Sequence, residues 1–366
     1  MLMQDYRTMR LDPTHNESML AILAASPINA NGLQLYFDKS PDLFTIPQMK
    51  YSSSEHLGMF KGDEFKGFGS LGYFDALVQG QPENVFSFYN FYLLPEARGT
   101  QIVKEVARDF FSSVRGKANY GISITLKGNR PAESYIGKKI ADWYPPNRII
   151  DELVVKSIFF ALPKKNTSSY KIRNACLEDI PDIVRLLQAE HAQRDFGIPF
   201  HEDTFLANLA NRKLSVENYY VATTPGGNIK GVCLAWDCSA FRRPRVLSYS
   251  SKFYPTLWTY AALEKILPLA PFPAAGECFN ELTITDYAVT NRDPVIMHAL
   301  LCEIYHRHYK SKYHFIQWAS CGSDPLLQAA NGLWHKNMTS HIIFNSMDPE
   351  RYHIQPHLPY IDIAFI

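Results

Sequence analysis

The sequence predicts an α/β protein with mixed β-sheets flanked by helices, arranged as two halves that follow the same plan. Residues 86–114 read as an apolar strand, a turn and an amphipathic helix. The short strand-like pattern of Tyr6–Arg10 returns at Tyr170–Arg173, and a predicted helix follows each of them. A chain of 366 residues also exceeds one typical hydrophobic core.

The composition is that of a soluble globular protein, with 46% hydrophobic and 20% charged residues. A net charge of +1 gives no electrostatic reason to expect nucleic acid or an anionic membrane as partner. The first residues lack the basic and apolar pattern of a signal peptide, and no run of about twenty apolar residues would span a bilayer. We therefore expect a cytoplasmic protein with no nucleic-acid or membrane partner; the oligomeric state stays open.

All six cysteines lie in the second half, and no two form a C-x-x-C pair. A secreted disulfide framework would be denser and would include the first half. We expect reduced, mostly buried thiols at Cys176, Cys233, Cys238, Cys278, Cys302 and Cys321.

In the first half, apolar runs predict strands and helical spacing predicts helices. In chain order these are a strand at 6–11, a helix ending at 25, an apolar run at 33–37, a short helix at 41–51, strands at 55–61, 65–78 and 86–93, a helix after residue 100, a strand at 120–126, a short helix at 129–138 and a strand at 149–162 that closes the sheet. Gly67, Gly69 and Gly72 form the string G-x-G-x-x-G inside a strand and open no helix, so we interpret them as bends or bulges and not as a dinucleotide loop.

The second half repeats this order after a polar segment, so we predict domains at 1–163 and 170–366 joined by a linker at 164–169. Its predicted elements are a strand at 170–173, a helix at 177–193, a hairpin of strands 218–223 and 229–236, a helix at 256–266, a strand at 281–289, a helix at 294–309, a strand at 313–320, a helix at 324–330 and strands at 337–344 and 360–366.

The turn after the strand at 86–93 is the stretch in which the sequence most clearly suggests a binding site. Pro95 ends the strand because it has no amide to give to a ladder. Arg98, Gly99 and Thr100 make the turn, with Thr100 as the expected N-cap of the helix. Such a turn directs free backbone N–H groups and the positive end of a helix at one point, where an anion can bind.

This arrangement resembles motif A of the GCN5-related N-acetyltransferase (GNAT) superfamily. In that family a strand ending V-x-P-E-x-R-G leads into a helix through Q/R-x-x-G-x-G/A, and the loop amides hold the pyrophosphate of acetyl-coenzyme A. Residues 93–99, LLPEARG, follow the first part well. Gln101 stands where the family has Gly and Val103 where it has Gly or Ala, and the Val103 side chain would crowd the diphosphate. The alternative is an ordinary strand–turn–helix corner.

The resemblance implies two tandem GNAT-like domains and an acetyl-CoA, or related acyl-CoA, site in the first. The cofactor-binding residues that it implies are Leu93, Arg98, Gly99, Thr100, Gln101, Ile102, Val103 and Asn129. The segment from Asn129 to Ala132, followed by Tyr135, resembles the family's N-x-x-A and Tyr segment, with Tyr135 one residue early. Tyr135 is then the general acid, or else a packed aromatic residue; Asn129 is a ligand, or else a plain helix cap. No metal is implied.

The general base is not identified by the sequence. The central strand offers Ser87, Tyr89, Asn90 and Tyr92 but no carboxylate. Glu83 and Asp75 are the nearest acids, and either acts through water or is a solvated surface group.

The second half departs from motif A. It has no glycine in the loop, and Pro294 removes an amide from the helix start. Asp293 is expected to cap that helix and to place negative charge where a diphosphate would lie. We therefore predict that this half does not hold coenzyme A in the usual way and instead shapes the acceptor cleft or mediates assembly; Glu281 and Asp286 are weaker site candidates.

Two further groups have simpler interpretations. Arg242, Arg243 and Arg245 form a basic cluster that we interpret as a solvated loop, with an anion contact as the alternative. His298, Cys302 and His306 share one helix face, but the core interpretation is better than a metal site because no fourth ligand is evident.

The resulting hypothesis is an acyl-CoA-dependent N-acyltransferase that transfers acetyl to a primary amine of a small molecule or peptide. The first alternative is a non-catalytic tandem protein that binds a ligand or partner, since neither loop keeps the full glycine pattern. The second is aminoacyl transfer from charged tRNA, as in the tandem-GNAT peptidoglycan-branching enzymes, which the neutral charge balance disfavours.

Overall fold

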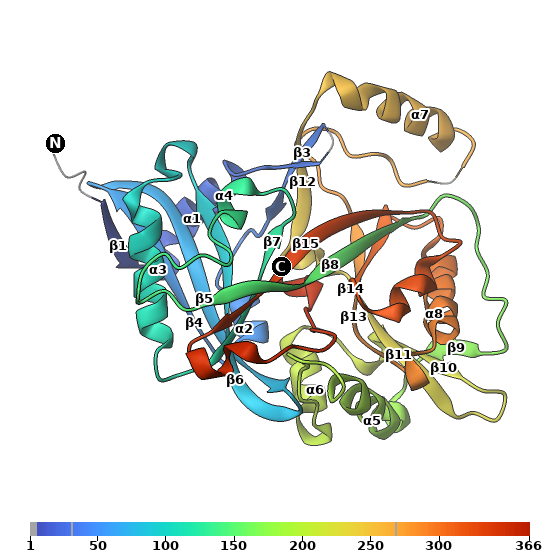
Figure 1. The fold of residues 1–366 in the computed structure, drawn as a ribbon. Helices are drawn as coiled ribbons and strands as arrows, with labels where there is room; N and C mark the ends of the chain where they lie inside the picture. The colour runs from blue at the N-terminus through green and yellow to red at the C-terminus, as the bar shows by residue number, and fades with distance from the viewer. Residues whose placement is uncertain (1–5, 31, 268) are drawn as a thin grey trace.

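One long mixed β-sheet runs through both halves of the chain in a computed structural model that describes residues 6–30, 32–267 and 269–366 (Figure 1). Over these residues the sheet has twelve strands in the order β1-β4-β5-β6-β7-β15-β8-β14-β13-β11-β10-β9, and a smaller sheet has the order β12-β3-β2. The predicted fold class, a mixed α/β fold with helices flanking the sheet, is confirmed.

The strands of both sheets are listed here in chain order. They are β1 (Tyr6–Arg10), β2 (Ile28–Ala30), β3 (Leu33–Asp38), β4 (Ser53–Lys61), β5 (Glu64–Val78), β6 (Gln81–Leu93), β7 (Tyr120–Leu126), β8 (Asn147–Phe159), β9 (Lys171–Asn174), β10 (Tyr219–Thr223), β11 (Ile229–Trp236), β12 (Arg243–Tyr249), β13 (Glu281–Val289), β14 (Phe315–Cys321) and β15 (His335–Ser346).

The α-helices are α1 (Asn16–Ala24), α2 (Thr45–Lys50), α3 (Gln101–Val114), α4 (Arg130–Glu133), α5 (Ile180–His191), α6 (Glu202–Asn211), α7 (Tyr254–Glu264) and α8 (Pro294–His308). Most α-helices flank the long sheet, whereas α7 lies beside the small sheet (Figure 1). No helix within the described residues is long and apolar enough to cross a membrane.

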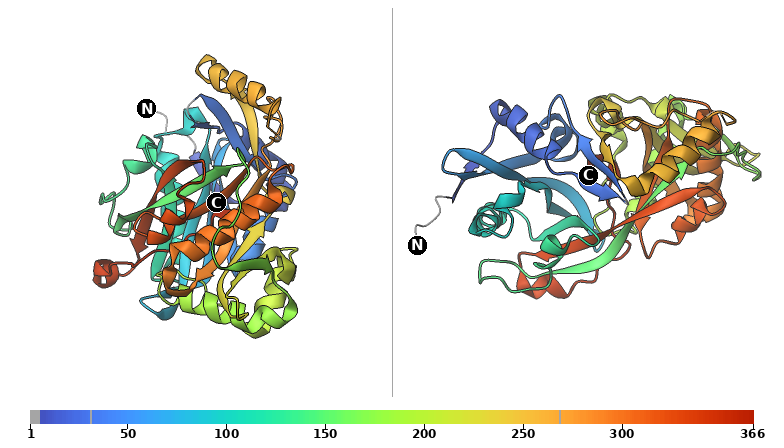
Figure 2. Two further views of the ribbon diagram at one scale, coloured as in Figure 1. Left: turned by 90° about the vertical axis from the view of Figure 1, so that its right-hand side faces the viewer. Right: turned by 90° about the horizontal axis from the view of Figure 1, so that it is seen from above.

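Each half buries a separate hydrophobic cluster on each face of its sheet. In the first half α3 places Ile102, Val106 and Phe110 on one face, at the helical spacing that the sequence shows. The helix α1 covers the opposite face with Met19 and Leu23, and the two helices lie on opposite sides of the strands (Figure 2). In the second half α8 packs on one face and α5 with α6 on the other.

The last long strand of each half lies in the sheet of the other half. The strand β8 pairs with β15 and β14, and β15 pairs with β8 and β7, always antiparallel. The two strands cross the middle of the molecule side by side (Figure 1). The prediction that residues 149–162 close the sheet of the first half was therefore wrong, because β8 completes the sheet of the second half. The domain boundary at residue 163 stays a prediction.

A second connection between the halves is a clasp formed by β3, β12 and the acid that ends β3. The strands pair antiparallel from Asp38 with Arg243 to Leu33 with Tyr249. Asp38 accepts hydrogen bonds from Arg243 at 3.1 Å and from Arg245 at 2.6 Å. Arg242 is 3% exposed and pairs with Glu281 at 2.9 Å. The interpretation of the three arginines as a solvated loop was wrong, because their acidic partners lie far along the chain.

Smaller differences concern segment ends and one missed helix. Residues 360–366 form no strand; they pass through a 3-10 turn at Ile363–Phe365 whose side chains are buried. The helix predicted at 129–138 is only the four-residue α4. The helix α6 was not predicted, because its apolar positions are few.

The described cysteines are free thiols, and four of them are buried, as predicted.

Removing the acid of the clasp tests whether it stabilises the protein. We expect Asp38→Ala to lower the free energy of unfolding by about 1–3 kcal/mol at neutral pH, because two half-buried arginines lose their partner. Hydrogen bonds from Ser40 and Arg245 lower the pKa of Asp38 despite its burial. Stability from such a group is present above the pKa of the unfolded state and is lost as the pH falls through the lower folded value, so wild type and variant should converge below about pH 4. Urea unfolding measures this.

The matched control is Asp63→Ala, because Asp63 pairs with Arg7 at 2.9 Å but its side chain is fully exposed. We expect a change of less than about 0.5 kcal/mol for it. Equal unfolding free energies for Asp38→Ala and wild type at neutral pH would contradict a stabilising clasp.

Candidate active site

The parallel strands β6 and β7 separate soon after they meet, which opens a split in the sheet of the first half. They pair only at Val85 with Tyr120 and at Phe86 with Gly121. The Phe86 ring lies directly over Gly121, where an added Cβ would stand 2.2 Å from it, so this last pairing requires glycine. The other edge of β7 is held by β15. Beyond Phe86, β6 therefore presents backbone groups that β7 does not pair.

A β-bulge lies on β6 beside this split. The register of β5 with β6 passes from Ser70 opposite Tyr89 to Phe68 opposite Tyr92, so two residues of β6 face Gly69 alone. Asn90, the first of them, has φ +51°, in the left-handed region that asparagine tolerates better than most residues. Gly69 of β5 lies opposite this bulge, and the register of β5 with β4 shifts next to Gly67, so two of the three glycines lie beside bulges, as predicted.

The loop after β6 leads directly to the start of α3, as predicted. Leu93 ends the strand, a 3-10 turn spans Pro95–Ala97, and Gly99 has φ +72° with open space around it. The Arg98 Nε donates to the Leu93 carbonyl at 3.3 Å. Thr100 occupies the N-cap position but makes no side-chain cap bond, because its hydroxyl donates to the Ala97 carbonyl at 2.7 Å. The expected capping bond is thus absent, and the first amides of α3 lack a side-chain cap.

The remaining predicted residues of this loop differ in environment. Gln101 is exposed and its amide donates to Glu105 at 3.4 Å. Ile102 is fully buried, so only its backbone is available to a ligand. Val103 is half-buried and packs against the cluster under α3.

Asn129 and Tyr135 lie beyond the end of β7. Asn129 occupies the N-cap position of α4, as its interpretation as a helix cap expected, but its side chain makes no capping hydrogen bond. Tyr135 is half-exposed and follows α4. No side-chain hydrogen bond joins either residue to the loop before α3 within the described ranges. Both residues follow β7, the strand on the side of the split opposite to β6 and the Arg98 loop.

Polar side chains that sequence reasoning did not combine gather on the face of β6 toward α1 and α2. The Tyr89 ring stacks on Tyr51 at 4.9 Å, and the Tyr89 hydroxyl is buried without a partner among the described residues. The His56 Nδ1 lies 2.8 Å from the Ser70 hydroxyl, and its Nε2 is also buried and unpaired. Burial lowers the pKa of His56 to about 4, so this imidazole is neutral near pH 7.

Lys39 contacts the bulge itself. Its Nζ donates to Asn90 Oδ1 at 2.7 Å, and the residue is 2% exposed. Burial, followed by the positive charges of Arg242 and Lys50, lowers the pKa of Lys39 to about 7. The only sequence signal was the polar Asn90 in an aromatic strand; Lys39 itself stands in a segment that reads as a turn.

The carboxylates that were considered as bases lie elsewhere. Asp75 is exposed and Glu83 pairs with Arg351 at 3.5 Å, both near the hairpin end of β5 and β6. Glu281 is paired with Arg242, and Asp286 accepts from Arg212 at 2.6 Å.

The second half has the same backbone features but a filled split. The strands β13 and β14 pair from Glu281 to Ile284 only, and a bulge places Asp286 at φ +43°. The Tyr287 hydroxyl, however, donates to the Ala319 carbonyl of β14 at 3.0 Å. The buried Arg194 guanidinium lies over the Tyr287 ring and pairs with Asp324 at 2.7 Å. Side chains thus occupy the space between these strands.

The start of α8 is also unlike that of α3. The Asp293 side chain accepts from the Val295 amide at 2.8 Å, so the predicted cap is confirmed and a carboxylate occupies the helix start. Pro294 removes one further amide. On the same helix His298 contacts the Ala329 carbonyl and Cys302, within the core that was expected. Among the described residues no group of three His, Cys, Asp or Glu side chains could hold a metal ion.

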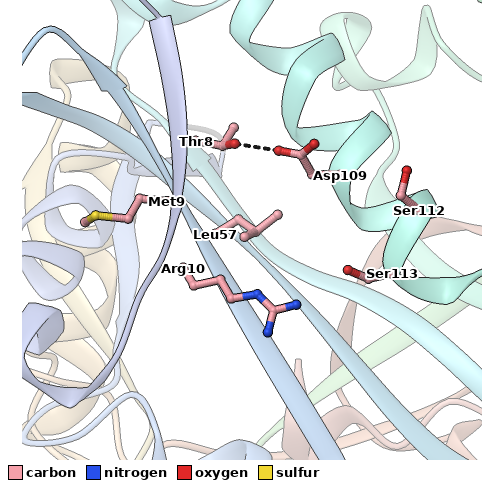
Figure 3. Close-up of a pocket in the computed structure, with 7 residues that line it drawn as sticks. All are labelled: Thr8, Met9, Arg10, Leu57, Asp109, Ser112 and Ser113. Atoms are coloured by element: carbon pink, nitrogen blue, oxygen red, sulfur yellow. Dashed lines mark hydrogen bonds between the residues drawn. The ribbon is translucent and has the colours of Figure 1, made fainter.

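A shallow hollow of about 330 Å³ lies between β1, β4 and α3, where Thr8 donates to Asp109 at 2.5 Å (Figure 3). Arg10, Leu57 and Ser113 also line it. None of the predicted site residues borders this hollow, so it is separate from the split.

Together these features suit a long ligand with an anionic end. An extended chain can bond the unpaired backbone of β6, and its phosphates can bind at the uncapped start of α3.

No family model and no curated protein sequence matches the chain. Several solved structures, however, match the chain over most of its length. An N-myristoyltransferase of Saccharomyces cerevisiae with bound myristoyl-CoA and inhibitors matches with a TM-score of 0.61 at 10% identity, over 94% of this chain and 81% of the other. A GCN5-related N-acetyltransferase of Anabaena variabilis matches with a TM-score of 0.52 at 9% identity, over 93% and 72%. A probable N-acyltransferase of Enterococcus faecalis matches with a TM-score of 0.50 at 11% identity, over 93% and 72%. The chain therefore has the GNAT fold, as the resemblance of its sequence predicted.

The glycine at the start of the split is expected to be essential for packing. We expect Gly121→Ala to lower the free energy of unfolding by about 1–3 kcal/mol, because its Cβ would overlap the buried Phe86 ring. Gly226→Ala is the control, since the nearest atom to its added Cβ is 3.9 Å away. Urea unfolding of both variants checks this; equal losses at the two sites would contradict the close approach of Phe86 to β7.

Proposed function

We propose that the protein is an acyl-CoA-dependent N-acyltransferase whose donor site is the split between β6 and β7. The observation that carries the proposal is the combination of this split with the bulge at Asn90 and the uncapped start of α3. Each feature alone occurs in many proteins, but together they offer an extended backbone edge that ends in an anion site.

In this proposal the pantetheine arm of the acyl-CoA lies along the unpaired edge of β6 from Ser87 to Leu93. The pyrophosphate binds the amides of residues 99–103, and the exposed Arg98 adds a positive charge. Gly99 permits close approach because nothing lies around its Cα. Asn129 contributes from the end of β7.

The thioester then lies beside the bulge, where a backbone N–H of β6 polarises its carbonyl. An amine attacks the carbonyl carbon, the C–N bond forms and the C–S bond breaks. The leaving thiolate takes a proton, for which Tyr135 remains the candidate donor.

The donor in this proposal is acetyl-CoA or a related acyl-CoA, and the acceptor is a primary amine of a small molecule or peptide. The likeness to an N-myristoyltransferase structure makes longer acyl chains worth testing as donors beside acetyl. The second half serves as a wall of the acceptor cleft, since its own split is filled by Tyr287 and Arg194.

Binding is tested by thermal unfolding with acetyl-CoA and, separately, with myristoyl-CoA. A ligand at 100 times its dissociation constant adds about 2.7 kcal/mol of stability, and a kcal/mol raises Tm by about 2–4 °C. We expect a rise of several degrees with at least one donor. Arg98→Glu should remove it by placing negative charge beside the pyrophosphate.

The matched control is Arg115→Glu, which makes the same charge change at the exposed far end of α3. The rise should persist in it. No rise with either donor in the folded wild type would reject the proposal.

A non-catalytic ligand-binding protein is the second candidate, because no described carboxylate forms a hydrogen bond with Asn90. Release of free CoA thiol with a panel of primary amines separates the two. Binding without release from any amine would favour this candidate.

A further inference from the structure

A buried amine, that of Lys39, forms a hydrogen bond with the bulge residue Asn90 of β6. Lys39 follows Asp38 at the end of β3, within the clasp between the halves. Its Nζ lies 2.7 Å from Asn90 Oδ1, on the face of β6 toward α1 and α2. Because of the clasp, the Lys39 amine lies beside the bulge on β6, where the thioester of the donor lies in the proposed complex.

The charges that face Lys39 disfavour its protonated form. Arg242 faces it from the second half and Lys50 faces it from α2, and both are positive. Tyr92 of β6 is half-buried near Arg242. The neighbouring Asp38 is already bonded to Arg243 and Arg245. No carboxylate of the described ranges forms an ion pair with Lys39.

The corresponding place in the second half has a different chemistry. There the bulge residue is Asp286, which accepts from Arg212 at 2.6 Å and from the Tyr219 hydroxyl at 3.0 Å. A guanidinium stays protonated in proteins, whereas a buried lysine amine can lose its proton. The bulge residue of the second half is thus bonded to a cation that does not titrate, whereas the bulge residue of the first half is bonded to an amine that can accept a proton.

We propose that Lys39 is the proton acceptor for the incoming amine, which makes it a catalytic residue of the reaction proposed above. This inference rests on the proposed function and supplies the base that the sequence did not reveal. It assigns Asn90 a positioning role, because its amide oxygen holds the Lys39 Nζ beside the bulge.

The step balances without a further reactant. The neutral Lys39 amine takes one proton from the substrate nitrogen as that nitrogen forms the C–N bond to the acyl carbon. The C–S bond breaks and its electron pair leaves with the thiolate. The proton on Lys39 then returns to the solvent or to the thiolate, so the net products are an amide and free CoA thiol. A lowered pKa of about 7 suits this task near neutral pH.

The first test compares Lys39→Met and Lys39→Arg with wild type, using a donor and an amine found in the panel. We expect acyl-CoA affinity to stay within about threefold, while kcat near neutral pH falls by about 10²–10⁴ in both variants. The loss should shrink as the pH rises, because the acceptor then loses its proton in solution. Lys39→Arg keeps the positive charge and should not rescue the rate.

The matched control is Lys156→Met, which removes another buried lysine, from β8, where its Nζ lies 3.1 Å from His335 Nε2. Its rate should stay within a few fold of wild type. If the wild-type protein does not bind acyl-CoA, the proposed function itself is rejected. Normal binding with an unchanged rate and pH profile in Lys39→Met would overturn only the role of Lys39.

A second test needs no substrate. A lysine whose pKa is lower in the folded than in the unfolded state makes unfolding more costly as the pH rises from about 7 to about 10, because the unfolded chain binds more protons there. Wild type should therefore gain stability relative to Lys39→Met over this range in urea unfolding. A difference that is constant with pH would show a charged Lys39 and overturn the proposal.

Discussion

The antiparallel pairing of β8 with β15 is the interaction on which the rest of the structure depends. Each strand leaves its own half and completes the sheet of the other, so neither half has a complete sheet alone. Because β7 is held from outside by β15, it does not follow β6 beyond Phe86, and the split in the first half stays open. The clasp at Asp38 is a second connection between the halves, and it positions Lys39 beside the bulge on β6. The proposed site is thus a property of both halves together.

The two halves share a backbone plan but differ in what fills it. Both have a short parallel pairing followed by a bulge with a polar residue at positive φ, Asn90 in one and Asp286 in the other. In the second half, Tyr287 bridges to β14, and Arg194 forms ion pairs with Glu190 and Asp324 that are fully buried. Buried pairs of this kind give little net stability but are costly to disrupt, so this split cannot open readily to a ligand. The first split has no such filling among the described residues.

The local features of this architecture could be predicted from the sequence, and the long-range features could not. The apolar strand at residues 86–93, its end at Pro95 and the face of α3 follow from periodicity and turn chemistry alone. The exchange of β8 and β15 joins residues nearly two hundred positions apart, and no local pattern specifies it. The same holds for Arg242, Arg243 and Arg245, whose partners lie in other segments. Lys39 is buried in the folded chain, where Arg242 of the second half and Lys50 of α2 lie near it, and no local pattern specifies either neighbour. The site residues Leu93 and Arg98 to Val103 remain predictions whose geometry fits.

Hydrogen exchange with and without a non-hydrolysable acyl-CoA thioether tests the central claim most directly, because it reports on each strand separately. The proposed site predicts slower exchange at residues 87–103, over the free edge of β6 and the start of α3. It also predicts no change at residues 285–297, the equivalent segment of the second half. Protection of the second segment in place of the first, or binding with protection of neither, would contradict an acyl-CoA site in the split between β6 and β7.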